Sequence, residues 1–204
     1  MPPRARFLTA FLYTFQGHDT TGYTISNTLT MLAEHPTIAT ELQQELLQTP
    51  KEKWDQVGQL QNVIQEVHRL LPVAGLGSLR SLEHDLDCEI DGRHICIPKG
   101  SNINLNMVLI HRNEKVFSNA DQFDPSRWSK STPEMKQSLM PFSLGNRNCI
   151  GQTLATAEIQ AVIPRLLAGY DFELVKKGEV ENFFDNENCR ISSTTQESCY
   201  RMNI

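Results

Sequence analysis

The chain has 204 residues, a formal net charge of −5, 39% hydrophobic residues and 21% charged residues. This length corresponds to roughly one to one and a half domains and allows a real hydrophobic core. The composition excludes a disordered chain, and the negative charge without any basic tract argues against nucleic acid as the main partner. The cysteines form no CxxC pair, so they favour a reducing compartment over a disulfide framework or a zinc site; they are Cys88, Cys96, Cys149, Cys189 and Cys199.

The first residues, "MPPRARFLTAFLYTF", carry two arginines and a short apolar run. They lack the small-x-small cleavage site of a signal peptide, and no run approaches the ~18 apolar residues of a spanning helix. From Phe7 to Glu34 the chain lacks proline and is rich in leucine, phenylalanine, isoleucine and threonine. This stretch predicts one long helix that ends before His35-Pro36 and is interrupted at Gly17 and residues 18–21.

The remaining elements are predicted from periodicity and turn residues. Thr37 to Gln48 and Leu60 to Leu71 have helical spacing, and Pro72 ends the second of these helices. "CEIDGRHICIPKG" predicts a hairpin with its turn at Asp91-Gly92. Further along, the chain predicts a short helix in 103–113, an irregular stretch over 113–139, a helix over 152–170 kinked at Pro164, and weak strands after Asp171. The fold class is therefore mainly α with a minor antiparallel β portion.

Cys149 lies between two glycines in "FSLGNRNCIG", just before the helix expected from about Gly151. The free N–H groups of a first helical turn favour a negatively charged sulfur, and glycines let the backbone approach a flat ligand. Arg147 adds a positive charge two residues away. A thiolate in this setting suits haem iron. A lone cysteine is more often buried and inert, and the framing residues outweigh that alternative.

Two further constellations carry chemistry or structure. Gly17, Asp19 and Thr20 place an acid beside an alcohol, which is what a buried oxygen-activation site needs to relay protons from solvent. The alternative is the polar face of an exposed helix. Glu66 and Arg69 stand three apart on a helix and can pair. On the surface such a pair contributes less than ~1 kcal/mol, whereas removing one partner of a buried pair costs roughly 3–5 kcal/mol.

"FSLGNRNCIG" resembles the haem-binding signature of the cytochrome P-450 family, Phe-x-x-Gly-x-Arg-x-Cys-x-Gly, and matches all five fixed positions. Three other stretches follow the family in order, namely "QGHDTTG", "EVHR" and "FDPSRW". The resemblance covers nearly the whole chain, from the family's long central helix onward, and weakens beyond about Gly178. Residue Gln16 departs from the Ala or Gly that is usual in the family.

The resemblance implies a role for each matching residue. Cys149 is the axial ligand of the haem iron, and Asp19 with Thr20 is the acid–alcohol pair, with Gly17 as the small residue near bound oxygen. Haem contacts are implied for the other signature residues and for the arginine after "VAGLGSL", which are Arg80, Phe142, Gly145, Arg147 and Gly151. The family pattern also implies a buried structural cluster of Glu66, Arg69 and Arg127. No histidine is expected to ligate a metal.

By the same resemblance, residues 1–204 form a single partial domain, the C-terminal haem-binding half of the P-450 fold. The implied activity is a haem-thiolate monooxygenase that uses haem b, O2, a small hydrophobic substrate and electrons from an NADPH-dependent reductase. The implied location is intracellular, at the cytosolic face of the endoplasmic reticulum membrane, with membrane contact but no anchor in this chain. Two alternatives stay open: an isomerase or dehydratase of the same fold, and a non-catalytic fragment.

Overall fold

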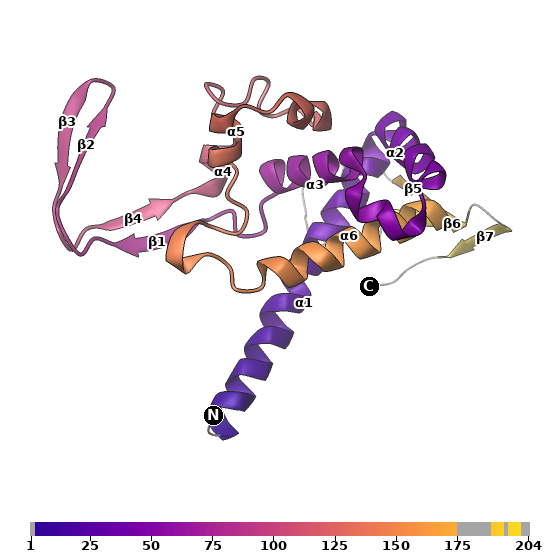
Figure 1. Cartoon of the computed structure of the whole chain (residues 1–204), viewed down its shortest axis with the longest axis horizontal. Coiled ribbons are helices and arrows are strands. Elements are labelled where there is room, and N and C mark those ends of the chain that lie inside the picture. Colours follow the sequence, from indigo (N-terminus) through magenta and orange to yellow (C-terminus); the bar gives the residue numbers. More distant parts are fainter. Residues whose placement is uncertain (1–2, 175–188, 194–195, 201–204) are drawn as a thin grey trace.

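The computed structural model describes the backbone of residues 3–174, 189–193 and 196–200, and the side chains of residues 17–172. Helices dominate these ranges: α1 (Pro3–Glu34), α2 (Pro36–Gln48), α3 (Gly58–Leu70), α4 (Met107–His111), α5 (Pro133–Ser138) and α6 (Gln152–Gly169). Short 3-10 helices lie at η1 (Lys51–Gln56), η2 (Pro125–Lys130) and η3 (Gly145–Arg147). Three small antiparallel sheets accompany them. The expected class, mainly α with a minor antiparallel β portion, is confirmed (Figure 1).

Helix α1 begins earlier than predicted and runs without the expected interruption at Gly17. Proline is tolerated in a first helical turn, so Pro3 does not delay the start of the helix. Threonine side chains within the helix bond back to its own carbonyls: Thr24 Oγ1 donates to Thr20 O at 3.2 Å and Thr28 Oγ1 to Thr24 O at 2.7 Å. The hydroxyls of Thr24 and Thr28 are therefore satisfied inside the helix, and the helix continues through the polar residues 18–21.

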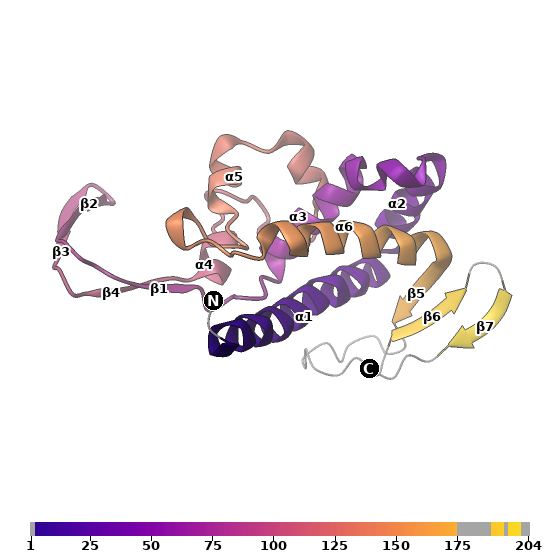
Figure 2. The same ribbon diagram turned by 60° about the horizontal axis from the view of Figure 1, so that its bottom comes forward.

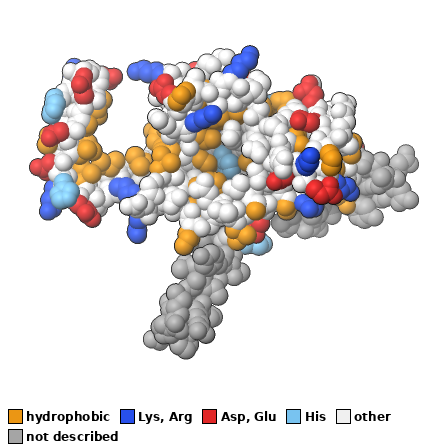
Figure 3. All heavy atoms as spheres, in the orientation of Figure 1, with side chains coloured by type: hydrophobic (Ala, Val, Ile, Leu, Met, Phe, Trp, Pro, Cys, Tyr) orange, Lys and Arg blue, Asp and Glu red, His pale blue; other side chains and the backbone are white. Residues whose placement is uncertain are grey.

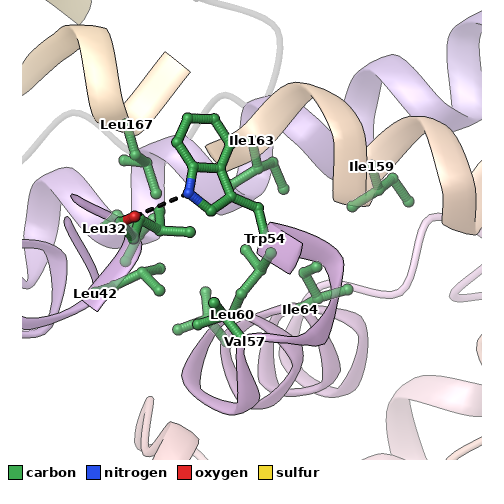
Figure 4. Packing of buried hydrophobic residues seen from close by; sticks show 11 residues of the cluster. Leu32, Leu42, Trp54, Val57, Leu60, Ile64, Ile159, Ile163 and Leu167 are labelled. Atoms are coloured by element: carbon green, nitrogen blue, oxygen red, sulfur yellow. Dashed lines mark hydrogen bonds between the residues drawn. The ribbon is translucent and has the colours of Figure 1, made fainter. Parts of the chain in front are cut away.

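The main core forms where α1, α2, η1, α3 and α6 meet, as Figure 4 shows from close by. Trp54 of η1 anchors it, because its indole Nε1 donates to Leu46 O at 2.8 Å while its ring is almost fully buried. Aliphatic side chains fill the rest; they are Leu32, Leu42, Leu46, Val57, Leu60, Val63, Ile64, Ile159, Ile163 and Leu167. Each fully buried aliphatic side chain contributes about 1.5–3 kcal/mol. Helix α6 continues through Pro164, where the sequence predicted a kink.

The sheets lie at two ends of the molecule (Figures 1 and 2). Strands β2 (Leu86–Ile90) and β3 (Arg93–Ile97) form the predicted hairpin, which projects away from the helices. Its turn residues have positive φ, 49° at Asp91 and 73° at Gly92, as tight hairpin turns require. At the other end, β5 (Tyr170–Leu174), β6 (Cys189–Ser193) and β7 (Gln196–Tyr200) form the third sheet.

Strands β1 (Ser78–Ser81) and β4 (Asn102–Leu105) pair with each other, and the sequence did not predict this sheet. The segment predicted as one short helix over 103–113 is divided between β4 and α4. Asn106 makes the division, because its side chain accepts a hydrogen bond from Leu109 N at 3.1 Å and caps α4. Side chains of β1 contact the loop that holds Cys149.

Candidate haem-ligand site

The Cys149 loop, residues 142–151, closes on itself before α6 begins. The backbone N–H of Cys149 donates to the carbonyl of Phe142 at 2.8 Å. Two loop residues have left-handed backbone, Ser143 with φ 61° and Gly145 with φ 74°. Cys149 is exposed, and Gly151 is the residue that precedes the first turn of α6. The helix therefore begins where the sequence predicted, with the thiol presented at its start.

The N-terminus of α6 is electrostatically suited to a thiolate. The residue before the helix, Gly151, has no side chain and therefore offers no capping acceptor to the first N–H groups of α6. A Cβ built on Gly151 would lie 3.9 Å from the Cys149 sulfur. The positive end of the helix dipole therefore lies close to the sulfur.

Large apolar side chains are exposed around the Cys149 loop. Relative exposure is 58% for Leu144, 87% for Ile150 and 56% for Leu154. Leu76, just before β1, and Leu79, within β1, are 86% and 73% exposed. Figure 3 shows hydrophobic side chains gathered where β1, β4 and α4 lie. Exposed apolar side chains near an exposed thiol fit a large flat apolar ligand, as haem is.

Strand β1 contacts the Cys149 loop through side chains. Arg80 donates from Nη2 to Ser143 Oγ at 3.3 Å, and Ser78 Oγ lies 3.3 Å from the same hydroxyl. Arg80 is half-buried, whereas Arg147 is exposed and forms no ion pair with any side chain in residues 17–172. Two guanidinium groups thus lie in or beside the loop without a carboxylate partner in this part of the chain, which leaves them able to bind an anionic ligand.

The predicted pair of Glu66 and Arg69 is fully buried on α3. Arg69 binds both carboxylate oxygens, with Nε to Oε2 at 3.0 Å and Nη2 to Oε1 at 2.8 Å. Arg127 donates from Nε to Oε1 at 3.0 Å, which makes it the third member of the cluster. Trp128 Nε1 and the backbone N–H of Asp124 also donate to this carboxylate, at 2.9 and 3.0 Å.

Arg69 satisfies its remaining N–H groups with backbone carbonyls. It donates to His111 O at 3.0 Å, to Ala120 O and to Gln122 O at 3.0 Å. The His111 carbonyl is at the end of α4, and the carbonyls of Ala120 and Gln122 lie in the irregular stretch that follows it. The buried cluster therefore joins α3 to the segments that lead into the Cys149 loop, with both guanidinium groups paired to the one Glu66 carboxylate.

Asp19 and Thr20 lie on α1 and are exposed among the described residues. Asp19 Oδ1 lies 3.1 Å from His18 Nδ1, and this pair is open to solvent. Gly17 has nothing within 4 Å of a built Cβ. The structure thus keeps the acid and the alcohol adjacent on the helix but does not bury them, because the elements that pack on α1 cover another part of its surface. The side chain of Gln16 lies outside the described residues.

The family model described as Cytochrome P450 matches residues 8–201. The chain belongs to the cytochrome P450 family. Its curated relatives include cytochrome P450 4d2 of Drosophila melanogaster, 34% identical over 177 residues, and cytochrome P450 4A10 of Mus musculus, 34% identical over 166 residues. Those matches cover 81% and 78% of this chain but 34% and 32% of the relatives.

Solved structures agree with this assignment. The structure described as retinoic acid bound cyanobacterial CYP120A1 superimposes with a TM-score of 0.75 at 26% identity. The match covers 90% of this chain and 44% of that one. This P450 chain therefore spans about a third of the curated relatives and has the corresponding part of the fold. The family implies a haem cofactor, and the exposed thiol, the helix N-terminus and the apolar surroundings fit that group.

Two buried histidines of the P450 chain had no predicted role. His68 and His111 are 8% and 0% exposed. Burial lowers the pKa of each to about 4, and the neighbouring His111 also lowers that of His68. The sequence did not predict that these two histidines are neighbours, because they lie on different helices, α3 and α4, that come together only in the fold. Among the described residues, no group of histidine, cysteine and acidic side chains could hold a metal ion, and no helix has the length and hydrophobicity to cross a bilayer.

Proposed function

We propose that this chain is the haem-ligand part of a P450 monooxygenase, with Cys149 as the residue that would bind the haem iron. The observation that carries the proposal is the exposed Cys149 thiol at the N-terminus of α6, in a loop that matches the family signature. Some relatives are named as monooxygenases, for example cytochrome P450 monooxygenase penB of Penicillium thymicola, at 33% identity. A thiolate-ligated haem supplies activation of O2 for inserting one oxygen atom into a hydrophobic substrate.

The residues of the loop would bind and orient the cofactor, haem b. Cys149, at the start of α6, would bind the iron, and Arg80 and Arg147 would bind the two carboxylates of the haem through guanidinium hydrogen bonds. Phe142, the first residue of the loop, would pack beside the ligand. Its ring lies edge-on to the His68 ring, with the two ring centroids 5.4 Å apart. Gly145 and Gly151 keep side chains away from the haem face.

The pair on α1 would handle protons. The Asp19 carboxyl would take protons from solvent, to which it is open, and the Thr20 hydroxyl would pass them toward the substrate side of α1. Gly17 would leave room there for O2. In this proposal the Glu66, Arg69 and Arg127 cluster performs no chemistry and fixes the scaffold behind the Cys149 loop.

Residues 1–204 are proposed to act as one partial domain within a longer polypeptide. The coverage supports this, since a relative matched over four fifths of this chain is about two and a half times as long. The electrons would come from an NADPH-dependent reductase. The complete protein would work in the cell at the cytosolic face of the endoplasmic reticulum membrane, with nucleic acid playing no part.

Isotope-labelled O2 tests the reaction. The complete polypeptide that carries this sequence, supplied with reductase, NADPH and a hydrophobic substrate, is expected to place one labelled oxygen atom in the product. Turnover that needs neither O2 nor reductant would instead identify an isomerase or dehydratase of the same fold. A haem spectrum without thiolate ligation, together with no turnover, would identify a non-catalytic fragment. The observation that favours this alternative is that the match covers only 34% of the relative.

A further inference from the structure

His111 connects the buried charge cluster to the start of the Cys149 loop. It is the last residue of α4, and its side chain is fully buried. Its backbone carbonyl accepts a hydrogen bond from Arg69 Nη1 at 3.0 Å. Its ring nitrogen Nε2 accepts one from the backbone N–H of Met140, also at 3.0 Å. Through these two hydrogen bonds, His111 links α3 to the residues just before the Cys149 loop.

Met140 lies at the base of the loop. Its carbonyl accepts from Ser143 N at 3.0 Å, and two residues further on, the Phe142 carbonyl accepts from Cys149 N at 2.8 Å. The Phe142 ring also contacts the His68 ring. The hydrogen bond from Met140 N to His111 is therefore the first in a short series. The bonds from Ser143 N to Met140 O and from Cys149 N to Phe142 O continue that series to the Cys149 backbone.

The hydrogen bond requires a particular form of the imidazole. Because Nε2 accepts from a backbone N–H, the neutral ring must carry its proton on Nδ1. Burial lowers the pKa of His111 to about 4, and the Arg69 guanidinium adds to that lowering, so the ring is neutral at ordinary pH. Nδ1 is buried and makes no hydrogen bond of good geometry in the described part of the chain, while the backbone carbonyls of Arg69 and His68 lie near enough to the ring to raise its pKa against the effect of burial. The Met140 N–H is therefore the well-formed hydrogen bond that the ring makes.

We propose that His111 is a positioning residue that holds the Cys149 loop in place for the haem, by accepting the Met140 N–H at Nε2. This inference rests on the proposed function. It goes beyond the family signature, since neither His111 nor Met140 belongs to "FSLGNRNCIG".

Amide substitutions separate the acceptor from the bulk of the ring. In H111Q the side-chain oxygen reaches about as far as Nε2, whereas in H111N it reaches only as far as Nδ1. H111F keeps the ring volume without an acceptor. His94, exposed on β3, provides the matched control H94N. All variants are made in the complete polypeptide that carries this sequence.

Two readouts are needed, one independent of haem. Amide hydrogen exchange at Met140 is expected to accelerate roughly tenfold or more in H111N and H111F, and to stay near wild type in H111Q and H94N. The reduced, CO-bound form should keep its red-shifted Soret band in H111Q and lose most of it in H111N and H111F. Equal behaviour of H111Q and H111N in both readouts would overturn the proposal.

The remaining outcomes are also decisive. If the substituted proteins do not fold, the wild type decides: protection of the Met140 amide supports the proposal, and exchange as fast as in an unbonded amide overturns it. A wild type without the thiolate band refutes the proposed function itself. A wild type with that band, matched by H111N, refutes only the positioning role.

Discussion

Replacing Glu66 by glutamine removes the negative charge at the centre of the buried cluster while keeping the shape of the side chain. The amide group takes the place of an oxygen that accepts at least two hydrogen bonds. If the amide nitrogen takes the Oε2 position, Arg69 Nε and Trp128 Nε1 lose their acceptor. If it takes the Oε1 position, Arg69 Nη2, Arg127 Nε and the backbone N–H of Asp124 lose theirs instead. Each buried donor left unsatisfied costs about 1–3 kcal/mol.

The cost of two or three unsatisfied donors agrees with the loss of about 3–5 kcal/mol expected when a buried ion pair loses one partner. We therefore expect Glu66→Gln to lower the free energy of unfolding by about 4 kcal/mol, a large part of the 5–15 kcal/mol of a typical protein. Urea unfolding measures it, followed by the fluorescence of Trp54 and Trp128. These residues lie in separate buried clusters, so coincident transitions would support two-state analysis.

Glu45→Gln is the matched control, because Glu45 is exposed on α2 and the substitution changes the charge by the same amount. It should alter the free energy of unfolding by no more than about 0.5 kcal/mol. A loss of less than about 1 kcal/mol for Glu66→Gln, the value of a surface pair, would refute the claim that this carboxylate organises the scaffold.

Two other predictions concern the buried histidines and the β1–β4 pair. Because burial lowers the pKa of His68 and His111 from 6.5 to about 4, the unfolded chain binds protons first as the pH falls. The free energy of unfolding should therefore fall between pH 6.5 and 4, by about 3 kcal/mol per histidine, and a flat profile in urea titrations across that window would contradict the burial. Gly77→Ala should destabilise strongly, since Gly77 has φ 84° and a Cβ there would overlap the Leu105 carbonyl; a thermal midpoint equal to wild type would argue against the β1–β4 pairing.

The local elements were largely predictable from the sequence, because their signals are local. Pro36 starts α2 and Pro72 ends the chain's third helix within about two residues of the observed bounds. Asp91-Gly92 identified the hairpin turn correctly. The β1–β4 pair was missed, because Ser81 and Asn102 become partners only through the fold and the strands themselves are short and mixed in polarity. The continuous α1 was missed for a different reason, since threonine hydroxyls that bond back to i−4 carbonyls do not interrupt a helix.

The site divides in the same way. Cys149, its glycines and the Glu66–Arg69 pair were visible as motifs with fixed spacing. His111 was not, because its importance lies in a bond to Met140 that no spacing rule predicts. The exposure of Asp19 was also unpredictable, since burial depends on what packs against α1 and not on the residues themselves.

The most direct test of the central claim is the absorption spectrum of the reduced, CO-bound protein after Cys149→Ala. Cys96→Ala, which removes another exposed free cysteine on β3, is the matched control. The complete polypeptide that carries this sequence should show the red-shifted Soret band of a thiolate-ligated haem, in the wild type and in Cys96→Ala alike. Cys149→Ala should lack it. A band that survives in Cys149→Ala would contradict the assignment of Cys149 as the ligand of the haem iron.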